Sequence, residues 1–258
     1  MVRKKVIISL IIACISVLVL AIYYFRIDLS ILYHRLSQAP STADSKNESI
    51  FKRYPRYLYG IDLSHYQGQI DWNQVNYIND SIPIAFIIIR ATMGIDGLDS
   101  TFITRWETIK SKEVVRGAYH YYRPNQHSLS QAKQFKSHVT LNPGDLPPIL
   151  DIENLSTIQS VENLKIGIKK WLVDVELHYG VTPIIYTGDH FYRKHLNTPE
   201  FDKYPIWIAN YGNYAEPFTQ PWSIWQFTER GQVEGVEGFI DLNIFKGTYP
   251  DFKALLIK

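Results

Sequence analysis

The chain has 258 residues, 46% of them hydrophobic and 14% aromatic, so it can bury a sizeable core. Its single cysteine, Cys14, excludes an intramolecular disulfide framework and a cysteine-based zinc cluster. The net charge of +2 is unevenly spread. Residues 1–57 hold nine Lys or Arg against three Asp or Glu (+6), whereas residues 58–258 hold 18 against 22 (−4). The larger part is slightly acidic and has no basic stripe, which argues against nucleic acid as a partner.

The N-terminus predicts a membrane anchor. Residues 6–25 are apolar and uncharged, and the basic residues Arg3, Lys4 and Lys5 precede them. Twenty helical residues span about 30 Å, the thickness of a bilayer's hydrocarbon core. The positive-inside rule keeps residues 1–5 in the cytoplasm. We therefore expect a single-pass membrane protein whose main part lies on the extracytoplasmic side, in the periplasm or outside the cell.

Two other interpretations of this segment stay open. A cleaved signal peptide usually has a shorter apolar region with a small-residue cleavage site close behind it. A lipoprotein would use Cys14 in "IIAC", although the apolar run continues for eleven residues beyond it. All three interpretations export the main part of the chain. Residues 26–57 then form a linker, and the polar stretch 37–49 predicts a flexible tether.

From residue 58 onward, short apolar runs alternate with helical patterns. Eight runs predict strands at 58–62, 85–92, 117–122, 148–153, 183–187, 206–210, 223–228 and 239–245. Helices are predicted near 72–79, 100–112, 128–139, 160–179 and 189–196. The helix 160–179 is the clearest, with Ser160 as its cap and Gly180 at its end. One of its faces is apolar and consists of Leu164, Ile168, Leu172, Val175 and Tyr179.

Strands that alternate with helices pair in parallel through crossover connections, and eight of them predict a closed barrel. The last three strands leave no room for full helices between them. In barrels of this class the chemistry lies at the C-terminal ends of the strands. Polar residues fall at those ends, namely Asp62, His120, Asp151, Glu153, Asn210, Gln226 and Asp241. Because closure makes the first and last strands neighbours, we expect Asp62 to lie beside Asp241.

The segment "LPPILDIEN", residues 146–154, places two acids directly after an apolar strand. In an extended chain, Asp151 and Glu153 share one face and Ile152 faces the other way. Each carboxylate raises the pKa of its neighbour, so one can keep a proton near neutral pH and act as the acid in glycoside hydrolysis. The same D-x-E pattern also occurs at surface strand ends and in ion pairs. Its position after a buried strand favours the catalytic interpretation.

A metal site is another interpretation, because carboxylates together with His65 and His120 can bind a cation. No closely spaced pair of histidines supports it, and we expect no metal and no cofactor. Both histidines also fit structural or rim positions, and Asp62 in "GIDLSH" also fits a turn.

Aromatic residues form the second signal, because their planes bury the apolar C–H faces of sugars. Those at predicted strand ends are Tyr66, Tyr119, Tyr121, Tyr186, Trp207, Tyr211, Trp225 and Phe227. Core filling is the alternative for many of them, and alternation puts Tyr119 and Tyr121 on the face opposite His120. The predicted substrate-binding residues are Tyr66, Tyr119, Tyr121, Tyr186, Trp207, Asn210, Tyr211 and Gln226.

Seven segments resemble, in order, the landmarks of glycoside hydrolase family 25, the lysozymes of the Chalaropsis type. They are "YGIDLSHYQGQIDW" (59–72), "FIIIRATMG" (86–94), "GAYHYYRP" (117–124), "PILDIEN" (148–154), "PIIYTG" (183–188), "PIWIANYG" (205–212) and "WSIWQFTERGQVEGVEGFIDLNIF" (222–245). The resemblance implies an irregular TIM-like (β/α)5(β)3 α/β barrel over residues 58–258. It also implies hydrolysis of the β-1,4 bond between N-acetylmuramic acid and N-acetylglucosamine in peptidoglycan. We expect a monomer that acts on peptidoglycan glycan strands.

The family's motif acids correspond to Asp62, Asp151, Glu153 and Asp241. The resemblance implies that Glu153 is the proton donor and that Asp151 is its partner. Family members commonly read "KATEG" where this chain has "RATMG" at 90–94, so an arginine replaces a lysine and a methionine a glutamate. Two other functions stay open. A chitinase-like enzyme would need D-x-x-D-x-D-x-E, whose earlier acids are missing here. A non-catalytic peptidoglycan-binding module would not need all four acids.

Overall fold

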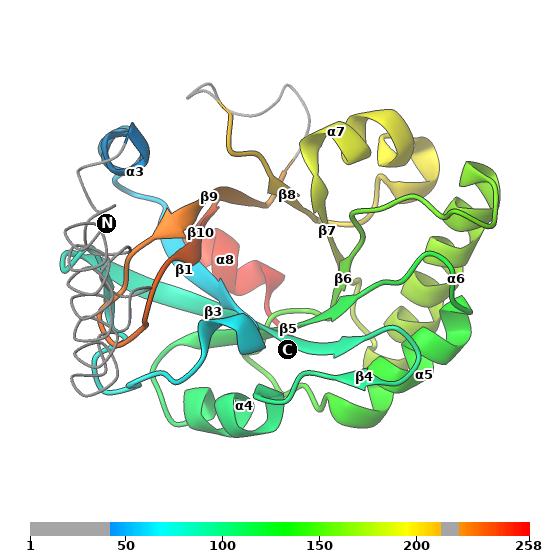
Figure 1. The fold of residues 1–258 in the computed structure, drawn as a ribbon, viewed down its shortest axis with the longest axis horizontal. Coiled ribbons are helices and arrows are strands. Elements are labelled where there is room, and N and C mark those ends of the chain that lie inside the picture. The colour runs from blue at the N-terminus through cyan, green and yellow to red at the C-terminus, as the bar shows by residue number, and fades with distance from the viewer. Residues whose placement is uncertain (1–41, 213–221) are drawn as a thin grey trace, which may run out of the picture. The chain divides into compact units, whose positions relative to one another are not determined.

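Eight strands close into a barrel in the computed structural model, which describes residues 42–212 and 222–258 (Figure 1). In chain order they are β1 (Leu58–Leu63), β3 (Ile82–Met93), β5 (Val115–Tyr121), β6 (Ile149–Asp151), β7 (Ile184–Gly188), β8 (Ile206–Ala209), β9 (Ile224–Gly231) and β10 (Ile240–Phe245). Each overlaps a predicted strand, so the eight predicted strands are confirmed. Two short strands, β2 (Tyr77–Ile78) and β4 (Gly97–Leu98), pair with the two ends of β3.

The barrel is parallel except at one strand. Successive pairs from β1–β3 to β8–β9 are parallel, whereas β10 runs antiparallel to both β9 and β1. The β1–β10 pair closes the ring, and its register sets Asp62 directly opposite Asp241. The prediction that closure brings these two acids together is confirmed.

Helices cover the outside of the parallel part (Figure 1). They are α4 (Phe102–Lys110), α5 (Ser128–His138), α6 (Val161–Tyr179), α7 (Asp189–Phe191), the π-helix η2 (Tyr192–Leu196) and the 3-10 helix η3 (Pro199–Phe201). The predicted helices at 100–112, 128–139, 160–179 and 189–196 are therefore confirmed. In α6 the Ser160 side chain accepts from the backbone N–H of Asn163, and Gly180 ends the helix with φ of 68°. Both roles follow from the sequence.

The predicted helix at 72–79 is wrong. This segment consists of turns and of β2. Between β1 and this segment the only helix is the 3-10 helix η1 (His65–Gln67). Asparagine side chains compete with the helix there, because Asn76 donates to the Asn73 carbonyl at 2.8 Å. Asn79 and Asp80 adopt positive φ values of 47° and 58°, which a helix cannot contain. The first β/α unit therefore lacks a full helix.

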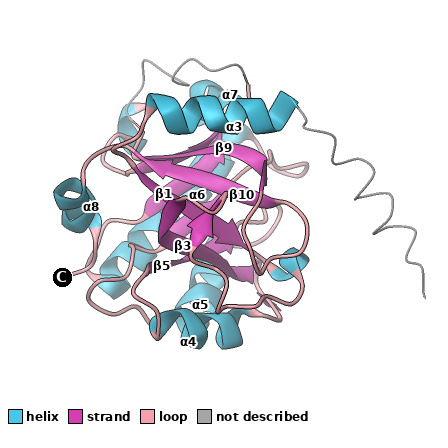
Figure 2. Ribbon diagram, turned by 90° about the vertical axis from the view of Figure 1, so that its left-hand side faces the viewer, coloured by secondary structure: helices cyan, strands magenta, loops and turns pink. Residues whose placement is uncertain are grey.

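The predicted linker, residues 26–57, is wrong in part, because Thr42–Arg53 forms the helix α3. Ile50 is 2% exposed, and the ring of Phe51 lies 5.9 Å from that of Phe227 on β9. Figure 2 shows α3 lying across the end of the sheet formed by β1, β9 and β10. The predicted membrane span at 6–25 lies outside the described residues. Within residues 42–212 and 222–258, no helix combines the length and the apolar character needed to cross a bilayer.

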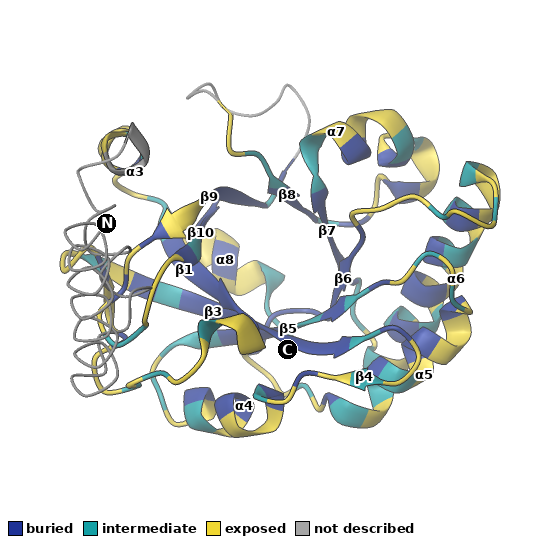
Figure 3. Cartoon of the chain, in the orientation of Figure 1, coloured by how far each residue is buried: buried dark blue, intermediate teal, exposed yellow. Residues whose placement is uncertain are grey.

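The core has two layers, and Figure 3 shows the strands buried between them. An outer layer packs the strands against the helices, whereas an inner layer fills the barrel. The inner layer includes Phe86, Ile88, Ile149, Ile184, Trp207 and Ile224. The helix α8 (Tyr249–Leu255) closes the lower end, where Phe252 contacts Phe86 and Phe245 with ring centroids 5.4 and 4.9 Å apart. The opposite end, at the C-terminal ends of the parallel strands, carries polar side chains.

Candidate active site

Four carboxyl groups gather at this polar mouth of the barrel. Asp62 lies near the end of β1, and Asp241 lies near the start of antiparallel β10, so both reach the same end. Asp151 ends β6, and Glu153 follows two residues later. Burial is the main cause of the raised pKa values of Asp62 and Asp241, and the charge of Glu153 raises both further. Acids from three strands therefore share one space.

Asp62 is held by side-chain amides. Its Oδ2 accepts hydrogen bonds from Gln226 Nε2 at 2.7 Å and from Asn243 Nδ2 at 2.8 Å. The other end of each amide is fixed as well. Oε1 of Gln226 accepts from Tyr186 and Tyr211 at 2.7 and 2.5 Å, and Oδ1 of Asn243 accepts from the Trp207 indole at 2.7 Å. These donors orient both amides with their N–H groups toward Asp62.

The Asp62–Asp241 pair ionises reluctantly. Burial raises the pKa of Asp62 to about 6, although the hydrogen bonds from Asn243 and Gln226 oppose the shift. Asp241 accepts no such bonds from the described residues, and burial followed by the charge of Asp62 raises its pKa to about 8. The pair is therefore partly protonated at neutral pH and carries less than two negative charges.

Asp151 and Glu153 form the second pair. Asp151 is 4% exposed, Glu153 is exposed, and Ile152 between them packs into the outer core. Burial is the main cause that raises the pKa of Asp151 well above its usual value. The charge of Glu153 is the second cause. Loss of hydration raises the pKa of the Glu153 carboxyl as well, although its hydrogen bond with Asp151 opposes the shift. The pair thus keeps a proton to higher pH than two separate carboxyls would.

The inward-facing aromatic residues line the mouth below and beside these acids. Tyr119, Tyr186 and Trp207 belong to the inner layer, and the Tyr186 and Trp207 rings meet edge to face at 4.4 Å. Tyr121 pairs with Asp151 in the β5–β6 register, and its hydroxyl accepts from Asn154 at 3.2 Å. The structure therefore brings these predicted residues together with Gln226 and Tyr211.

Other predicted residues lie differently. Tyr66 is 78% exposed on η1 at the rim, and its ring is tilted by 34° against that of His65 with centroids 4.1 Å apart. The Asn210 side chain donates to Asp189 at 3.1 Å and accepts from the Gly212 N–H, so its bonds are local ones. Trp225 and Phe227 belong to the outer core, which favours the core-filling alternative for both.

His120 belongs to the scaffold. It is fully buried outside the barrel, opposite Tyr119, and hydrogen-bonds to Thr92 at 2.7 Å and to Gln131 at 3.2 Å. Burial lowers its pKa to about 4, so it is neutral at physiological pH. The interpretation of His120 as a structural residue is confirmed.

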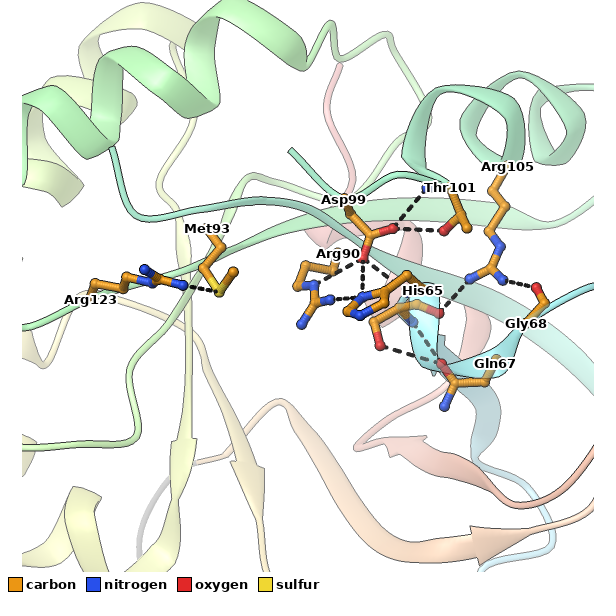
Figure 4. A network of polar contacts seen from close by, with 10 residues as sticks. His65, Gln67, Gly68, Arg90, Met93, Asp99, Thr101, Arg105 and Arg123 are labelled. Atoms are coloured by element: carbon orange, nitrogen blue, oxygen red, sulfur yellow. Dashed lines mark hydrogen bonds and ion pairs between the residues drawn. The ribbon is translucent and has the colours of Figure 1, made fainter. Parts of the chain in front are cut away.

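Three residues of the mouth were not predicted. Asn243 is two positions after Asp241, and the period of a strand places both on one face, which was a usable signal. Arg90 and Asp99 form a buried ion pair with Nε and Oδ2 3.0 Å apart, and Arg90 also contacts His65 (Figure 4). Asp99 further accepts from the His65 and Thr101 backbone N–H groups, so it fixes the η1 rim. No local pattern marks Asp99, because its partners are distant in sequence.

Comparisons with known proteins agree with this geometry. A family model described as glycosyl hydrolases family 25 matches residues 61–236. Lysozyme M1 of Streptomyces globisporus is 32% identical over 220 residues, covering 77% of this chain and 71% of its own. The uncharacterized protein YegX of Escherichia coli K12 is 36% identical over 201 residues, which cover 77% of this chain and 73% of YegX. The solved structure of a family 25 glycosyl hydrolase from Bacillus anthracis has a TM-score of 0.69 at 27% identity, covering 79% of this chain and 95% of that one. The chain therefore belongs to glycosyl hydrolase family 25 and is a glycosidase.

Proposed function

We propose that this protein is a membrane-anchored N-acetylmuramidase. It hydrolyses the β-1,4 bond between N-acetylmuramic acid and N-acetylglucosamine in peptidoglycan, with Glu153 as the proton donor. The observation that carries the proposal is that Glu153 is hydrogen-bonded to buried Asp151 and lies close enough to Asp62 and Asp241 for its charge to raise their pKa values. Membership of family 25 and the likeness to Lysozyme M1 support the same substrate class. Residues 6–25 would hold the enzyme at the membrane with its barrel on the extracytoplasmic side.

The catalytic step begins with the proton of the Asp151–Glu153 pair. Glu153 transfers it to the glycosidic oxygen as the bond from that oxygen to the sugar C1 breaks. The carbonyl oxygen of the substrate's own N-acetyl group forms a bond to C1 in its place. Water then attacks C1, the bond from C1 to the acetyl oxygen breaks and restores the N-acetyl group, and Glu153 takes a proton from the attacking water. Two acids that are two positions apart in the chain cannot readily flank opposite faces of a sugar, so Asp151 is a poor direct nucleophile.

Asp151 would orient the N-acetyl group. Within the described part of the chain, its Oδ1 is buried and accepts no hydrogen bond. The N–H of the substrate's acetamido group can donate to this oxygen. Such a donor stabilises the charged form of Asp151 and leaves the shared proton on Glu153, where it is needed. Asp62 and Asp241, each less than fully ionised, would hold the sugar and limit the negative charge beneath it.

A Glu153→Gln variant tests the proposal. We expect turnover to fall by about 10²- to 10⁴-fold, because an amide cannot supply the proton. The thermal midpoint should stay unchanged, because the substituted group is exposed. Glu107→Gln on α4 removes an exposed carboxyl away from the mouth and is the matched control. Clearing of a cell-wall suspension gives the rate, and a free reducing end on muramic acid rather than on glucosamine identifies the bond.

The same assay separates the competing functions. A chitinase-like enzyme would release reducing ends from chitin at least as fast as from cell walls. A binding module would sediment with the walls and release none. A folded Glu153→Gln protein with wild-type turnover would falsify the assignment of the proton donor.

A further inference from the structure

Arg123 is an exposed cation whose only side-chain contact at hydrogen-bond distance among the described residues is a thioether. Its Nη2 lies 3.3 Å from Sδ of Met93, and no carboxylate in residues 42–212 or 222–258 pairs with it. A thioether sulfur is a weak acceptor, whereas a guanidinium offers five N–H donors in a planar fork suited to carboxylates. Arg123 thus keeps most of its hydrogen-bonding capacity. Figure 4 shows its guanidinium contacting Met93, apart from the network around Arg90.

Arg90 provides the contrast on the same rim. It lies on β3 near Met93, but its side chain is only 10% exposed and is paired with Asp99. It also contacts His65 and lies over the Tyr66 ring at 5.4 Å. The charge of Arg90 is therefore committed to the scaffold, and the charge of Arg123 is free for a ligand.

The stem of Arg123 is held in place although its head is exposed. Its backbone N–H donates to Gln131 Oε1 at 2.8 Å, and its carbonyl accepts from Gln131 Nε2 at 2.9 Å. Gly94 has φ of 60°, and a Cβ there would lie 2.9 Å from the Arg123 Cδ. This glycine lets the arginine stem lie close against the β3–β4 turn. The backbone and the stem of Arg123 are therefore placed before a ligand binds, which reduces the entropy lost on binding.

Strand register places Arg123 on the catalytic rim. Met93, Tyr121 and Asp151 are at one level on β3, β5 and β6. Arg123 is two residues past Tyr121, just as Glu153 is two residues past Asp151. The ladder continues between these positions, since the Tyr122 N–H donates to the Asp151 carbonyl at 2.8 Å. The charge of Glu153 raises the pKa of Tyr121 and the charge of Arg123 lowers it, after the larger effect of burial, so both side chains lie near the Tyr121 hydroxyl on one rim.

We propose that Arg123 binds a carboxylate of the muramic acid residue and so distinguishes the muramic acid side of the scissile bond from the glucosamine side. The inference rests on the proposed function, because N-acetylglucosamine carries no carboxylate and N-acetylmuramic acid carries a lactyl group. That carboxylate is free in peptide-free glycan, and in peptide-bearing glycan the stem peptide supplies carboxylates instead. Met93 contributes to this binding site, because a glutamate at position 93 would form an ion pair with Arg123 and compete with the ligand.

The test measures binding by the full chain in detergent with Glu153→Gln as the background, so that no glycan is consumed. Three soluble glycans of equal length are compared. One carries stem peptides, one is peptide-free with lactyl carboxylates, and in the third those carboxylates are reduced to alcohols. We expect Arg123→Ala and Met93→Glu each to weaken binding of a carboxylate-bearing glycan by about 1.5-fold to fivefold, the range for an exposed ion pair. Binding of the reduced glycan should stay unchanged.

Two further variants sharpen the result. Arg123→Lys keeps the charge without the fork and should lose less affinity than Arg123→Ala. Arg56→Ala removes an exposed arginine that precedes β1, at the opposite end of the barrel, and should bind all three glycans normally. Loss of affinity for the peptide-free glycan assigns the lactyl carboxylate, and loss confined to peptide-bearing glycan assigns the stem peptide.

Equal affinities of the Glu153→Gln protein with and without Arg123→Ala would overturn the inference, as would an equal loss on the reduced glycan. The proposed function fails by a different readout. If the protein with Glu153 releases no reducing ends from any glycan, the hydrolase assignment falls while the binding data still decide the role of Arg123.

Discussion

Asp62 and Asp241 are direct partners across two antiparallel strands, and their hydrogen bonds differ. Asp62 accepts two amide hydrogen bonds, whereas Asp241 accepts none from the described residues. This difference separates their raised pKa values, about 6 for Asp62 and about 8 for Asp241. A raised carboxyl pKa means that the folded state holds protons that the unfolded chain releases. The stability linked to these groups is full below about pH 4 and is lost as pH rises through 6 and then 8.

An Asp241→Asn variant should be more stable than the native protein at pH 9 by roughly 1 to 2 kcal/mol, because no charge then forms beside Asp62. The value is smaller than the full shift implies, since the mouth is open to water. At pH 4 the difference should vanish, because the native carboxyl is then protonated in the folded state. Urea unfolding at both pH values measures the difference. Asp96→Asn, at an exposed position, is the control. Equal free energies of unfolding for the native and Asp241→Asn proteins at pH 9 would contradict this account.

Single residues were predictable where a strand's period fixed the side of the sheet. Asp151 and Glu153 share a face because they are two apart, and Tyr119 opposes His120 for the same reason. Hydrogen-bond partners were not predictable. The sequence placed Asn210 at a strand end but could not reveal that its amide bonds to Asp189. Asp99 was missed because its role depends on contacts 9 to 34 positions away.

At the scale of elements, the short helix α8 closes the floor of the barrel. Phe252 is fully buried there, in contact with inner-layer aromatics, while Tyr249 on the same helix is exposed. A barrel whose lower end is filled in this way keeps its inner layer dry.

Phe252→Ala should lower the free energy of unfolding by about 3–5 kcal/mol, because it leaves a cavity in a packed core. The mouth lies at the other end, so the rate per folded molecule at low temperature should match that of the native protein. Chemical denaturation measures the first effect and the wall-clearing assay the second. Tyr249→Ala should change neither quantity. A Phe252→Ala loss below about 1 kcal/mol would show that α8 does not seal the floor.

Elements were predictable where one signal dominated. The strands followed from short apolar runs, and α6 followed from its cap, its apolar face and its terminal glycine. The segment 72–79 has apolar residues at helical spacing, but asparagine bonds to the backbone prevail there. The polar composition around α3 predicted a tether, yet Ile50 and Phe51 dock on the barrel and stabilise a helix. Tertiary packing of two side chains is invisible to a composition argument.

At the scale of the whole molecule, residues 6–25 would confine hydrolysis to glycan near the membrane. Introducing Leu18→Arg and Leu20→Arg into the full chain should shift it from the membrane fraction to the soluble fraction, because each buried arginine costs about 2.5–3.5 kcal/mol in a central position. Fractionation after carbonate extraction measures the shift, and Leu155→Arg at an exposed barrel position is the control. A native chain that stays soluble, or one shortened at its N-terminus, would contradict an anchor and favour a cleaved leader.

The antiparallel strand β10 has a consequence for how the protein is made. It supplies Asn243, which donates to Asp62 from 181 positions further along the chain. Contacts of such sequence separation form late, because a long loop must close before they contribute. A chain whose last residues are not yet made lacks the strand that closes the ring, even when Glu153 is already present. We therefore expect the site to be complete, and hydrolysis to begin, only after β10 has been synthesised.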